Sequence, residues 1–171
     1  HGITLHTVKT YELSNKNYIK NSPDRCFHCK EELYSKLQEK ASELGVQVVL
    51  DGTHPGDLQG HRPGHKAALS LNVKSPFIDT DISKSEIRAM AEHLGLNNAT
   101  SPSSPCLSSR VAYGVPVTPE RLLRIERSEA VLHELGFPKV RVRLHGPTAR
   151  IEVPAADISR LAQLHKKISH E

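Results

Sequence analysis

The sequence predicts an α/β protein, with a parallel-sheet, Rossmann-like domain over residues 1–115 and a small α+β domain over residues 116–171. The elements expected up to residue 95 alternate strand, helix, strand, helix, which is typical of a parallel sheet covered by helices. After residue 116 the expected order is helix, strand, strand, helix. Residues 96–117 show no periodicity and contain several prolines, and a loop of that length is usually functional or disordered. We therefore place the domain boundary near residue 115.

The first domain begins with an expected strand over residues 2–9, where apolar and polar side chains alternate and β-branched residues are frequent. A helix is expected from about residue 29 to residue 44, because apolar residues recur on one helical stripe there. Gly45 stands where a C-terminal cap is expected. Residues 46–51 then form a short apolar run, which predicts a buried strand ending at Asp51.

Two helices complete the first domain. A short one is expected over residues 66–72. Ser83 and Glu86 form a capping box that predicts the start of the second. Gly95 is expected to end it.

The second domain opens with a strong helix start. Thr118 is followed by a proline, and the helical pattern runs on to Gly136. Two alternating strands are expected over residues 139–145 and 149–153, with the segment GPT between them. Residues 154–167 predict a last amphipathic helix.

The composition is that of an ordinary globular chain with a mild preference for anionic ligands. Its 171 residues include 23 basic and 19 acidic side chains, a net charge of +4, and 37% hydrophobic residues. No apolar run reaches the ~18 residues of a membrane span and no signal-peptide pattern appears, so we expect a cytoplasmic protein without a membrane partner. The interspersed charges favour phosphates or nucleotides over nucleic acid. No GxSxG or HExxH motif is present, which argues against a hydrolase triad and a zinc protease.

The segment CFHC places Cys26 and Cys29 three residues apart at an expected helix start. In a reducing compartment this spacing indicates metal binding or redox chemistry rather than a structural disulfide. The helix dipole and the neighbouring Arg25 and Lys30 favour the thiolate forms. Together with Cys106 the chain offers three thiolates, which would leave one iron of a four-iron cluster open. A zinc half-site, a redox pair and two ordinary thiols are the alternative interpretations.

Four polar residues follow the second expected strand and are candidates for a ligand pocket: Asp51, Thr53, Asp57 and Arg62. In parallel α/β sheets, ligands gather beyond the carboxyl ends of the strands. An aspartate that caps a glycine-rich turn explains the same pattern equally well.

Arg141 and Arg143 lie two residues apart in the first expected strand of the second domain, so both point to the same face. Such a pair suits the recognition of phosphate or carboxylate through bidentate guanidinium contacts. A solvated outer face is the alternative, and it is the more common case for strands of this type.

Taken in chain order, five stretches resemble the LarE family of ATP-dependent sulfur transferases, which belongs to the PP-loop superfamily. The stretches are NSPDRCFHCKEELYSKL, VVLDGTHPGDLQGHRPGHKAA, SPFIDTDISKSEIRAMAEHLGL, SPCLSSRVAYGVPVTPERLLRIE and FPKVRVRLHGPTARIEVP. The similarity covers nearly the whole chain. Its most specific part is PCLSSR followed by YGVPVTPE.

This resemblance implies an enzyme that adenylylates a carboxylate of a pyridinium mononucleotide, using ATP and Mg²⁺, and then inserts sulfur. The product leads to the nickel-pincer cofactor of lactate racemase. Cys106 matches the cysteine of the family's sulfur-bearing loop, and Arg110 would hold an anionic substrate beside it. The sulfur comes either from Cys106, which is left as dehydroalanine, or from a [4Fe-4S] cluster. The presence of Cys26 and Cys29 favours the cluster.

The resemblance carries further expectations. Glu129 falls where the family binds a divalent cation, and Arg141 and Arg143 fall where it contacts phosphate. A homo-oligomer is expected, with the lactate racemase maturation proteins as partners.

The sequence departs from the family in two large respects. The further strand and glycine-rich tail with which the family usually continues after the last helix are missing, so we expect the domain over residues 116–171 to be truncated. The ATP-binding SGGxDS loop is absent from these 171 residues, so we expect an inactive fragment that lacks the first strands and the PP-loop. A PP-loop enzyme of tRNA thiolation and a non-catalytic metal or iron-sulfur module are the two alternatives.

Overall fold

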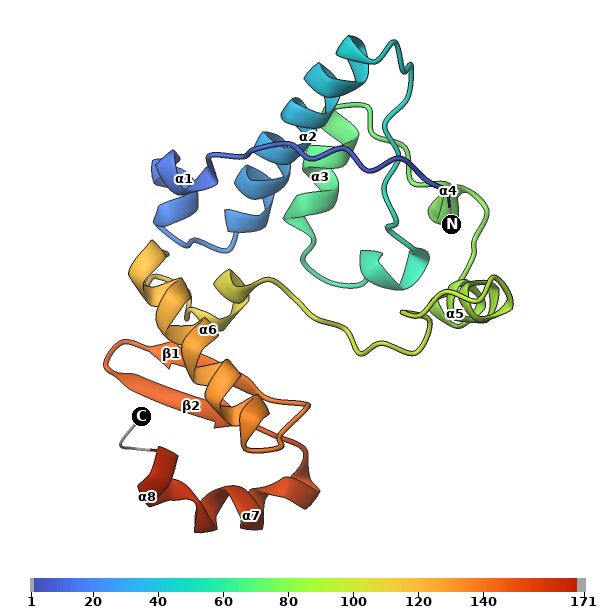
Figure 1. Ribbon diagram of the computed structural model, residues 1–171. Coiled ribbons are helices and arrows are strands. Elements are labelled where there is room, and N and C mark those ends of the chain that lie inside the picture. Colours follow the sequence, from blue (N-terminus) through green and yellow to red (C-terminus); the bar gives the residue numbers. More distant parts are fainter. Residues whose placement is uncertain (1, 169–171) are drawn as a thin grey trace. The chain divides into compact units, whose positions relative to one another are not determined.

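The computed structural model describes residues 2–168 and divides the chain into two compact units (Figure 1). The first unit comprises His1–Tyr18 and Pro23–Ser104, and the second comprises Ile19–Ser22 and Pro105–Glu171. The sequence placed the domain boundary near residue 115. The units divide ten residues earlier, so Cys106 and the segment that follows it belong to the second unit.

The first unit is built from helices. Its longest helix, α2, covers Arg25–Glu43 and lies beside α3 (Figure 1). The remaining elements in chain order are η1 (Glu12–Ser14), α1 (Lys16–Ile19, which ends in the second unit), η2 (Pro55–Leu58), α3 (Pro63–Ser70), α4 (Pro76–Asp79) and α5 (Lys84–His93).

The packing of α2 against α3 forms the core of this unit. Tyr34 of α2 is buried against Ala67 and Ala68 of α3 and against Val73, which follows α3. Small alanines at this contact let the two helices approach closely, and the ring of Tyr34 fills the space between them.

The predicted end of α2 and the predicted start of α5 are confirmed, whereas α2 begins at Arg25, four residues before the expected start. Gly45 lies beyond the C-terminus of α2 with a φ of +66°, and the amide of Val46 donates to the carbonyl of Ala41. The α5 capping box forms as expected, with the amide of Ser83 donating to the Glu86 carboxylate at 2.8 Å.

The parallel sheet predicted for the first domain is not formed by the described residues. Residues 2–9 adopt no strand, and the second expected strand contributes a single parallel bridge between Leu50 and Lys74. Val46 and Val48 are 51% and 50% exposed, and Leu50 is 60% exposed. A strand persists only when its backbone amides and carbonyls pair with a neighbour. These segments have the predicted side-chain pattern but no partner strand among residues 2–168.

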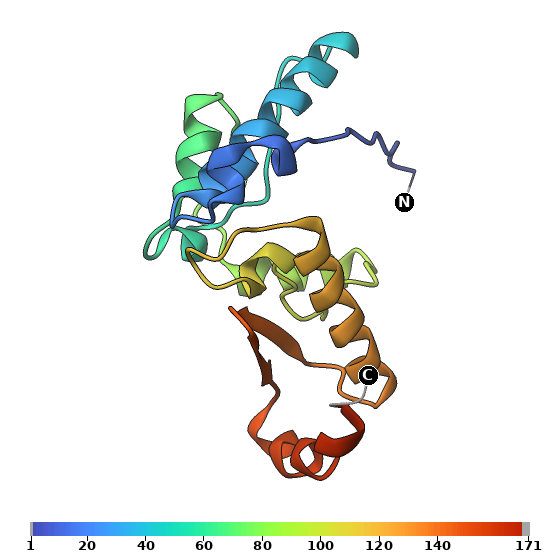
Figure 2. The ribbon, with the colours of Figure 1, turned by 90° about the vertical axis from the view of Figure 1, so that its left-hand side faces the viewer.

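The second unit pairs one long helix with a two-stranded antiparallel sheet. Helix α6 (Pro119–Glu134) contacts β1, which is followed by β2 (Figures 1 and 2). The other elements are η3 (Leu107–Arg110), β1 (Arg141–His145), β2 (Thr148–Glu152), η4 (Ala155–Asp157), α7 (Ile158–Gln163) and α8 (His165–Ile168).

Most predictions for this unit are confirmed. The Thr118 hydroxyl accepts from the amide of Arg121 at 3.3 Å and starts α6. The two strands form a hairpin in which Val142 faces Ile151 and Arg143 faces Arg150. The single last helix predicted over residues 154–167 is wrong in detail, because the structure divides that segment into η4, α7 and α8.

The apolar core of the second unit lies between α6 and the hairpin. Leu132 of α6, Phe137 and Val140 of the connection, and Val142 of β1 are all buried. This core uses one side of the hairpin, so the alternate residues of β1, including Arg143, lie on its other side. No helix of the described chain is long and apolar enough to cross a membrane.

Gly136 is expected to resist substitution, because it ends α6 with a φ of +83° and a Cβ atom there would lie 2.8 Å from Nη2 of Arg160. We expect Gly136→Ala to lower the free energy of unfolding by more than the about 1–2 kcal/mol that a left-handed backbone costs an alanine. The Arg160 guanidinium would have to move aside, and it would then lose its hydrogen bond to the carbonyl of Leu135 and its contact with the Phe137 ring. Gly146→Ala is the matched control, since Gly146 has a φ of +60° and open space around its Cα. Urea unfolding of both variants would measure the difference, and equal losses would contradict the predicted clash with Arg160.

Candidate functional site

A cavity of 390 Å³ in the first unit collects the polar residues that sequence singled out. Asp51, Thr53, Asp57 and Arg62 all line it, together with Cys26. Cys26 comes from the first turn of α2, Asp57 from η2, and Arg62 from the position before α3. The structure therefore brings four predicted pocket residues and one predicted cysteine to a single surface.

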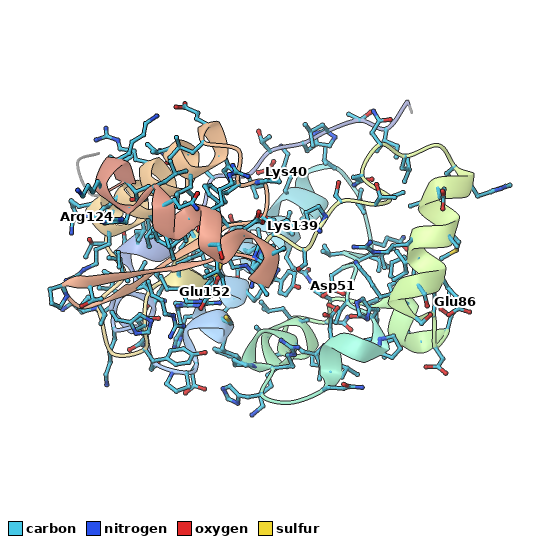
Figure 3. The ribbon with its side chains drawn as sticks, turned by 90° about the horizontal axis from the view of Figure 1, so that it is seen from below. Lys40, Asp51, Glu86, Arg124, Lys139 and Glu152 are labelled. Carbon is cyan, nitrogen blue, oxygen red and sulfur yellow. The ribbon has the colours of Figure 1, made fainter. Side chains whose placement is uncertain are left out.

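Asp51 is the best-connected residue of the cavity (labelled in Figure 3). Its carboxylate accepts hydrogen bonds from the hydroxyls of Tyr34 at 2.8 Å, Thr53 at 2.8 Å and Ser75 at 2.7 Å. The backbone amide of Thr53 donates as well, at 3.1 Å. The carboxylate thus orders its own surroundings, and it also holds a negative charge at the wall of the cavity.

These hydrogen bonds act on the ionisation of two groups. Burial alone raises the pKa of Asp51, but the donors Ser75, Thr53 and Tyr34 outweigh burial and leave the pKa below its ordinary value. Burial, followed by the hydrogen bond to Asp51, raises the pKa of the Tyr34 hydroxyl. Asp51 is therefore ionised and Tyr34 is a stable donor at neutral pH.

Cations and a thiol share the cavity with this carboxylate. Lys30 places its ammonium 5.3 Å from the centre of the Tyr34 ring, and His61 and His65 line the wall near Arg62. Nδ1 of His65 is buried and has no hydrogen-bond partner within the described residues. The cavity thus offers cationic donors for an anionic polar ligand beside the nucleophilic sulfur of Cys26.

Sequence reasoning missed Lys30 and Tyr34 as pocket residues. A signal was present, because Cys26, Lys30 and Tyr34 recur every four residues and so lie on one face of α2. His61, His65 and Ser75 had no comparable signal, since their positions depend on how α3 and its flanking turns pack.

The three cysteines are divided between the units. Cys26 and Cys29 lie one helical turn apart in α2, where Cys26 is exposed and Cys29 is half-buried. Cys106 is exposed and precedes η3 in the second unit. In neither unit does the described chain gather three or more His, Cys, Asp or Glu side chains as a metal site. The predicted three-cysteine cluster draws on both units and stays a prediction.

In the second unit, Arg110 and Glu129 form a buried ion pair. Nε of Arg110 lies 2.9 Å from Oε1 of Glu129, and their side chains are only 6% and 10% exposed. The same carboxylate oxygen accepts the backbone amide of Val142 at 2.9 Å. The resemblance implied that Arg110 holds an anionic substrate and that Glu129 binds a divalent cation, whereas here their charges contact each other. Both ligand roles stay predictions.

The arginines of β1 lie in different surroundings. Arg143 pairs with Glu152 of β2 at 2.7 Å and donates to the carbonyl of Ser109 at 3.0 Å. Arg141 faces Glu152 across the hairpin. The hydrogen bond with Arg143, followed by that with Arg150, holds the pKa of Glu152 below its ordinary value despite some burial. Both predicted phosphate contacts stay predictions, and Arg143 is already engaged in the structure.

Stability is expected to fall in acid through Asp51. Because its folded-state pKa lies below the unfolded value of about 3.9, the carboxylate stabilises the fold above that pH and loses the contribution as pH falls through the folded pKa. We expect Asp51→Asn to remove this part of the pH dependence, measured as urea midpoints between about pH 7 and pH 3. The exposed Asp79→Asn is the control. A parental pH profile in Asp51→Asn would contradict the prediction.

Three curated proteins are similar to the chain. An uncharacterized protein of Synechocystis is 43% identical over 162 residues, which is 95% of this chain and 60% of that protein. A pyridinium-3,5-bisthiocarboxylic acid mononucleotide synthase of Lactiplantibacillus plantarum is 35% identical over 93% of the chain and 58% of its own length. An uncharacterized protein of Methanocaldococcus jannaschii is 33% identical over 94% of the chain and 65% of its length.

The resemblance extends along nearly the whole chain. No protein-family model matches the chain. The chain spans 58% to 65% of the length of these relatives.

Proposed function

We propose that the chain is part of a LarE-family sulfur transferase that acts on a pyridinium mononucleotide. The similarity to the mononucleotide synthase carries this proposal, since it covers 93% of the chain at 35% identity. The name of that relative states the chemistry, because a bisthiocarboxylic acid differs from a dicarboxylic acid by sulfur in place of oxygen. The cavity of the first unit supports the proposal with cationic donors for an anionic ligand and a thiol at its wall.

The reaction we propose has two steps. A carboxylate oxygen of the mononucleotide attacks the α-phosphorus of Mg²⁺-bound ATP, and pyrophosphate leaves with the electron pair of the broken P–O bond. A sulfur nucleophile then attacks the acyl carbon, and AMP leaves with the electron pair of the C–O bond. Adenylylation is needed because an oxide ion is a very poor leaving group, whereas AMP is a good one.

The roles of the residues follow from their positions and charges. We assign Asp51, Thr53, Asp57 and Arg62 to the nucleotide and its phosphates, because all four line one cavity. Arg141 and Arg143 are assigned to phosphate, and Glu129 to a divalent cation, on the resemblance alone. In the structure Glu129 neutralises Arg110, so cation binding would require that pair to open.

Two sources of sulfur are open in this proposal, Cys106 itself or a cluster held by all three cysteines. Cys106 is exposed at the start of η3 and can meet a ligand. If Cys106 is the donor, its thiolate forms a thioester with the acyl carbon. Loss of the Cα proton then breaks the Cβ–S bond, and the electron pair stays on sulfur, which yields a thiocarboxylate and dehydroalanine. Alternatively, Cys26, Cys29 and Cys106 would hold a [4Fe-4S] cluster, whose open iron would supply an exchangeable sulfide.

We further propose a parallel, PP-loop type sheet that the described residues form only in part. The parallel bridge of Leu50 with Lys74, made by the amides of Asp51 and Lys74, is the pairing expected within such a sheet. The half-exposed Val46 and Val48 beside it are suited to burial under further strands. In this proposal the protein works as a cytoplasmic homo-oligomer with lactate racemase maturation proteins.

The test is an anaerobic assay of the full-length protein that contains this chain, with ATP, Mg²⁺ and a pyridinium mononucleotide carboxylate, before and after treatment with iron and sulfide. Mass spectrometry would follow the product, AMP and the mass of Cys106. A thiocarboxylate with dehydroalanine at Cys106 supports the single-use donor. A thiocarboxylate with an intact Cys106 supports the cluster, and Cys26→Ser should then abolish turnover.

Two results would favour another function. When tRNA is added to the assay, thiolated tRNA formed in place of the mononucleotide product indicates tRNA modification. Bound iron without release of AMP indicates a non-catalytic module. A folded protein that releases no AMP and binds no iron would contradict the proposal.

A further inference from the structure

The backbone around Cys106 is held by two guanidinium groups. Nη1 of Arg110 donates to the carbonyl of Pro105 and, at 3.0 Å, to the carbonyl of Cys106 itself. Nη1 of Arg143 donates to the carbonyl of Ser109 at 3.0 Å. Both ends of the turn that carries the thiol are therefore attached to a cation.

Each of these cations is anchored by a carboxylate from a regular element. Glu129 of α6 binds Nε and Nη2 of Arg110 at 2.9 and 3.3 Å, and it is itself fixed by the amide of Val142. Glu152 of β2 (labelled in Figure 3) binds Nε of Arg143 at 2.7 Å. The contacts run from α6 and the hairpin through two carboxylates and two arginines to the backbone of the turn.

Further contacts within the turn reinforce this arrangement. The amide and hydroxyl of Ser109 donate to the carbonyl of Cys106 at 3.0 and 2.7 Å. Beyond the turn, Val111 forms a parallel bridge with Leu144 of β1. The carbonyl of Cys106 thus accepts from several donors, while the Cys106 residue remains exposed.

We infer that Arg110 and Arg143 are positioning residues that fix the Cys106 turn on α6 and the hairpin and present its thiol to solvent. The inference rests on the proposed function only in assigning sulfur chemistry to Cys106. A sulfur atom held in place reaches an acyl carbon with less loss of conformational entropy than one on a freely moving loop. The serine- and proline-rich residues 101–105 before it adopt no helix or strand, so no regular element holds the turn from that side.

The two arginines are expected to contribute unequally. The Arg110–Glu129 side chains are 6% and 10% exposed, and those of Arg143 and Glu152 are 28% and 36% exposed. Solvent and salt screen the second pair more than the first. Lysine is a poor replacement for either arginine. Each guanidinium binds a carboxylate and a backbone carbonyl oxygen at the same time, and a single ammonium group cannot reach both.

The test is the mobility of a nitroxide attached to Cys106 in the full chain, with Cys26→Ser and Cys29→Ser removing the other thiols. We expect an immobilised spectrum in this parent and an about tenfold larger mobile fraction in Arg110→Lys and Glu129→Gln, because loss of hydrogen bonds from charged groups shifts a local opening equilibrium by that order. Arg143→Lys should give a smaller rise, and Arg124→Lys, on the exposed side of α6, should give none.

Unchanged spectra in folded Arg110→Lys and Arg143→Lys would overturn the inference. Should Arg110→Lys fail to fold, as judged by circular dichroism, the half-exposed Arg143→Lys decides the outcome. The spectra require neither ATP nor substrate. A label that is immobilised in the parent and mobile in the arginine variants would therefore support the positioning role even if the unlabelled protein transfers no sulfur, a result that would contradict only the proposed function. Sulfur transfer by the unlabelled protein together with spectra that the arginine variants leave unchanged would support the proposed function and overturn the positioning role.

Discussion

Glu129→Ala is expected to lower the free energy of unfolding of the second unit by about 3–5 kcal/mol, because the substitution leaves a buried arginine without its counter-charge. Arg110 would keep its carbonyl contacts but lose both hydrogen bonds to the carboxylate. The amide of Val142 would lose its acceptor in the same step. Urea unfolding followed by far-ultraviolet circular dichroism measures the effect.

A more exposed ion pair is the control for this prediction, because its loss should lower the free energy of unfolding far less. Lys40 and Glu43 on α2 are also only 2.8 Å apart, but their side chains are 34% and 64% exposed (Lys40 is labelled in Figure 3). We expect Lys40→Ala to cost much less than Glu129→Ala, because solvent screens an exposed ion pair. Glu129→Gln, which keeps an acceptor for Val142, should fall between the two. A loss below that of Lys40→Ala would show that the Arg110–Glu129 contact contributes little to the fold.

Asn21→Ala is expected to cost about 2–5 kcal/mol and to detach residues 19–22 from the second unit. The side chain of Asn21 is fully buried, and its amide nitrogen lies 2.8 Å from the carbonyls of Ala112 and Val115. Carbonyls left without a donor cost about 1–3 kcal/mol, and an alanine at its φ of +56° costs about 1–2 kcal/mol more.

Asn72→Ala is the matched control for the backbone part of this effect. Asn72 has a φ of +53° and an exposed side chain, so its replacement should show only the cost of the left-handed backbone. Hydrogen exchange of the Gly114 amide, which donates to the carbonyl of Asn21 at 3.1 Å, reports detachment of the segment directly. Equal losses in the two variants would contradict a structural role for the Asn21 side chain.

Helices were the most predictable part of this chain. The capping residues Ser83 and Thr118 and the terminating Gly45 and Gly136 act through contacts within three or four residues, so their effect is present in the sequence itself. The hairpin of the second unit was equally accessible, because its two alternating segments are adjacent in the chain and pair with each other.

Strands without an adjacent partner were not predictable in the same way. Residues 2–9 and 46–51 have the composition of strands, yet only Leu50 forms a bridge. Whether such segments form a sheet depends on distant strands, which side-chain alternation does not report. The candidate pocket residues could be named nonetheless, because Asp51, Thr53, Asp57 and Arg62 lie in one turn-rich stretch of the chain. That stretch lines the cavity together with residues of α2 and α3.

The sequence by itself determined the capped helices α5 and α6, the hairpin and the chemical types of the residues around the cavity, because these depend on periodicity, caps and composition. Only the tertiary structure decided how the charges pair. Arg110 and Glu129 are 19 residues apart, and Arg143 lies 34 residues from the carbonyl that it holds. A charged side chain can pair with any group of suitable charge and geometry. The packing of α6 against the hairpin, and not the neighbouring residues in the chain, therefore determines which partner it meets.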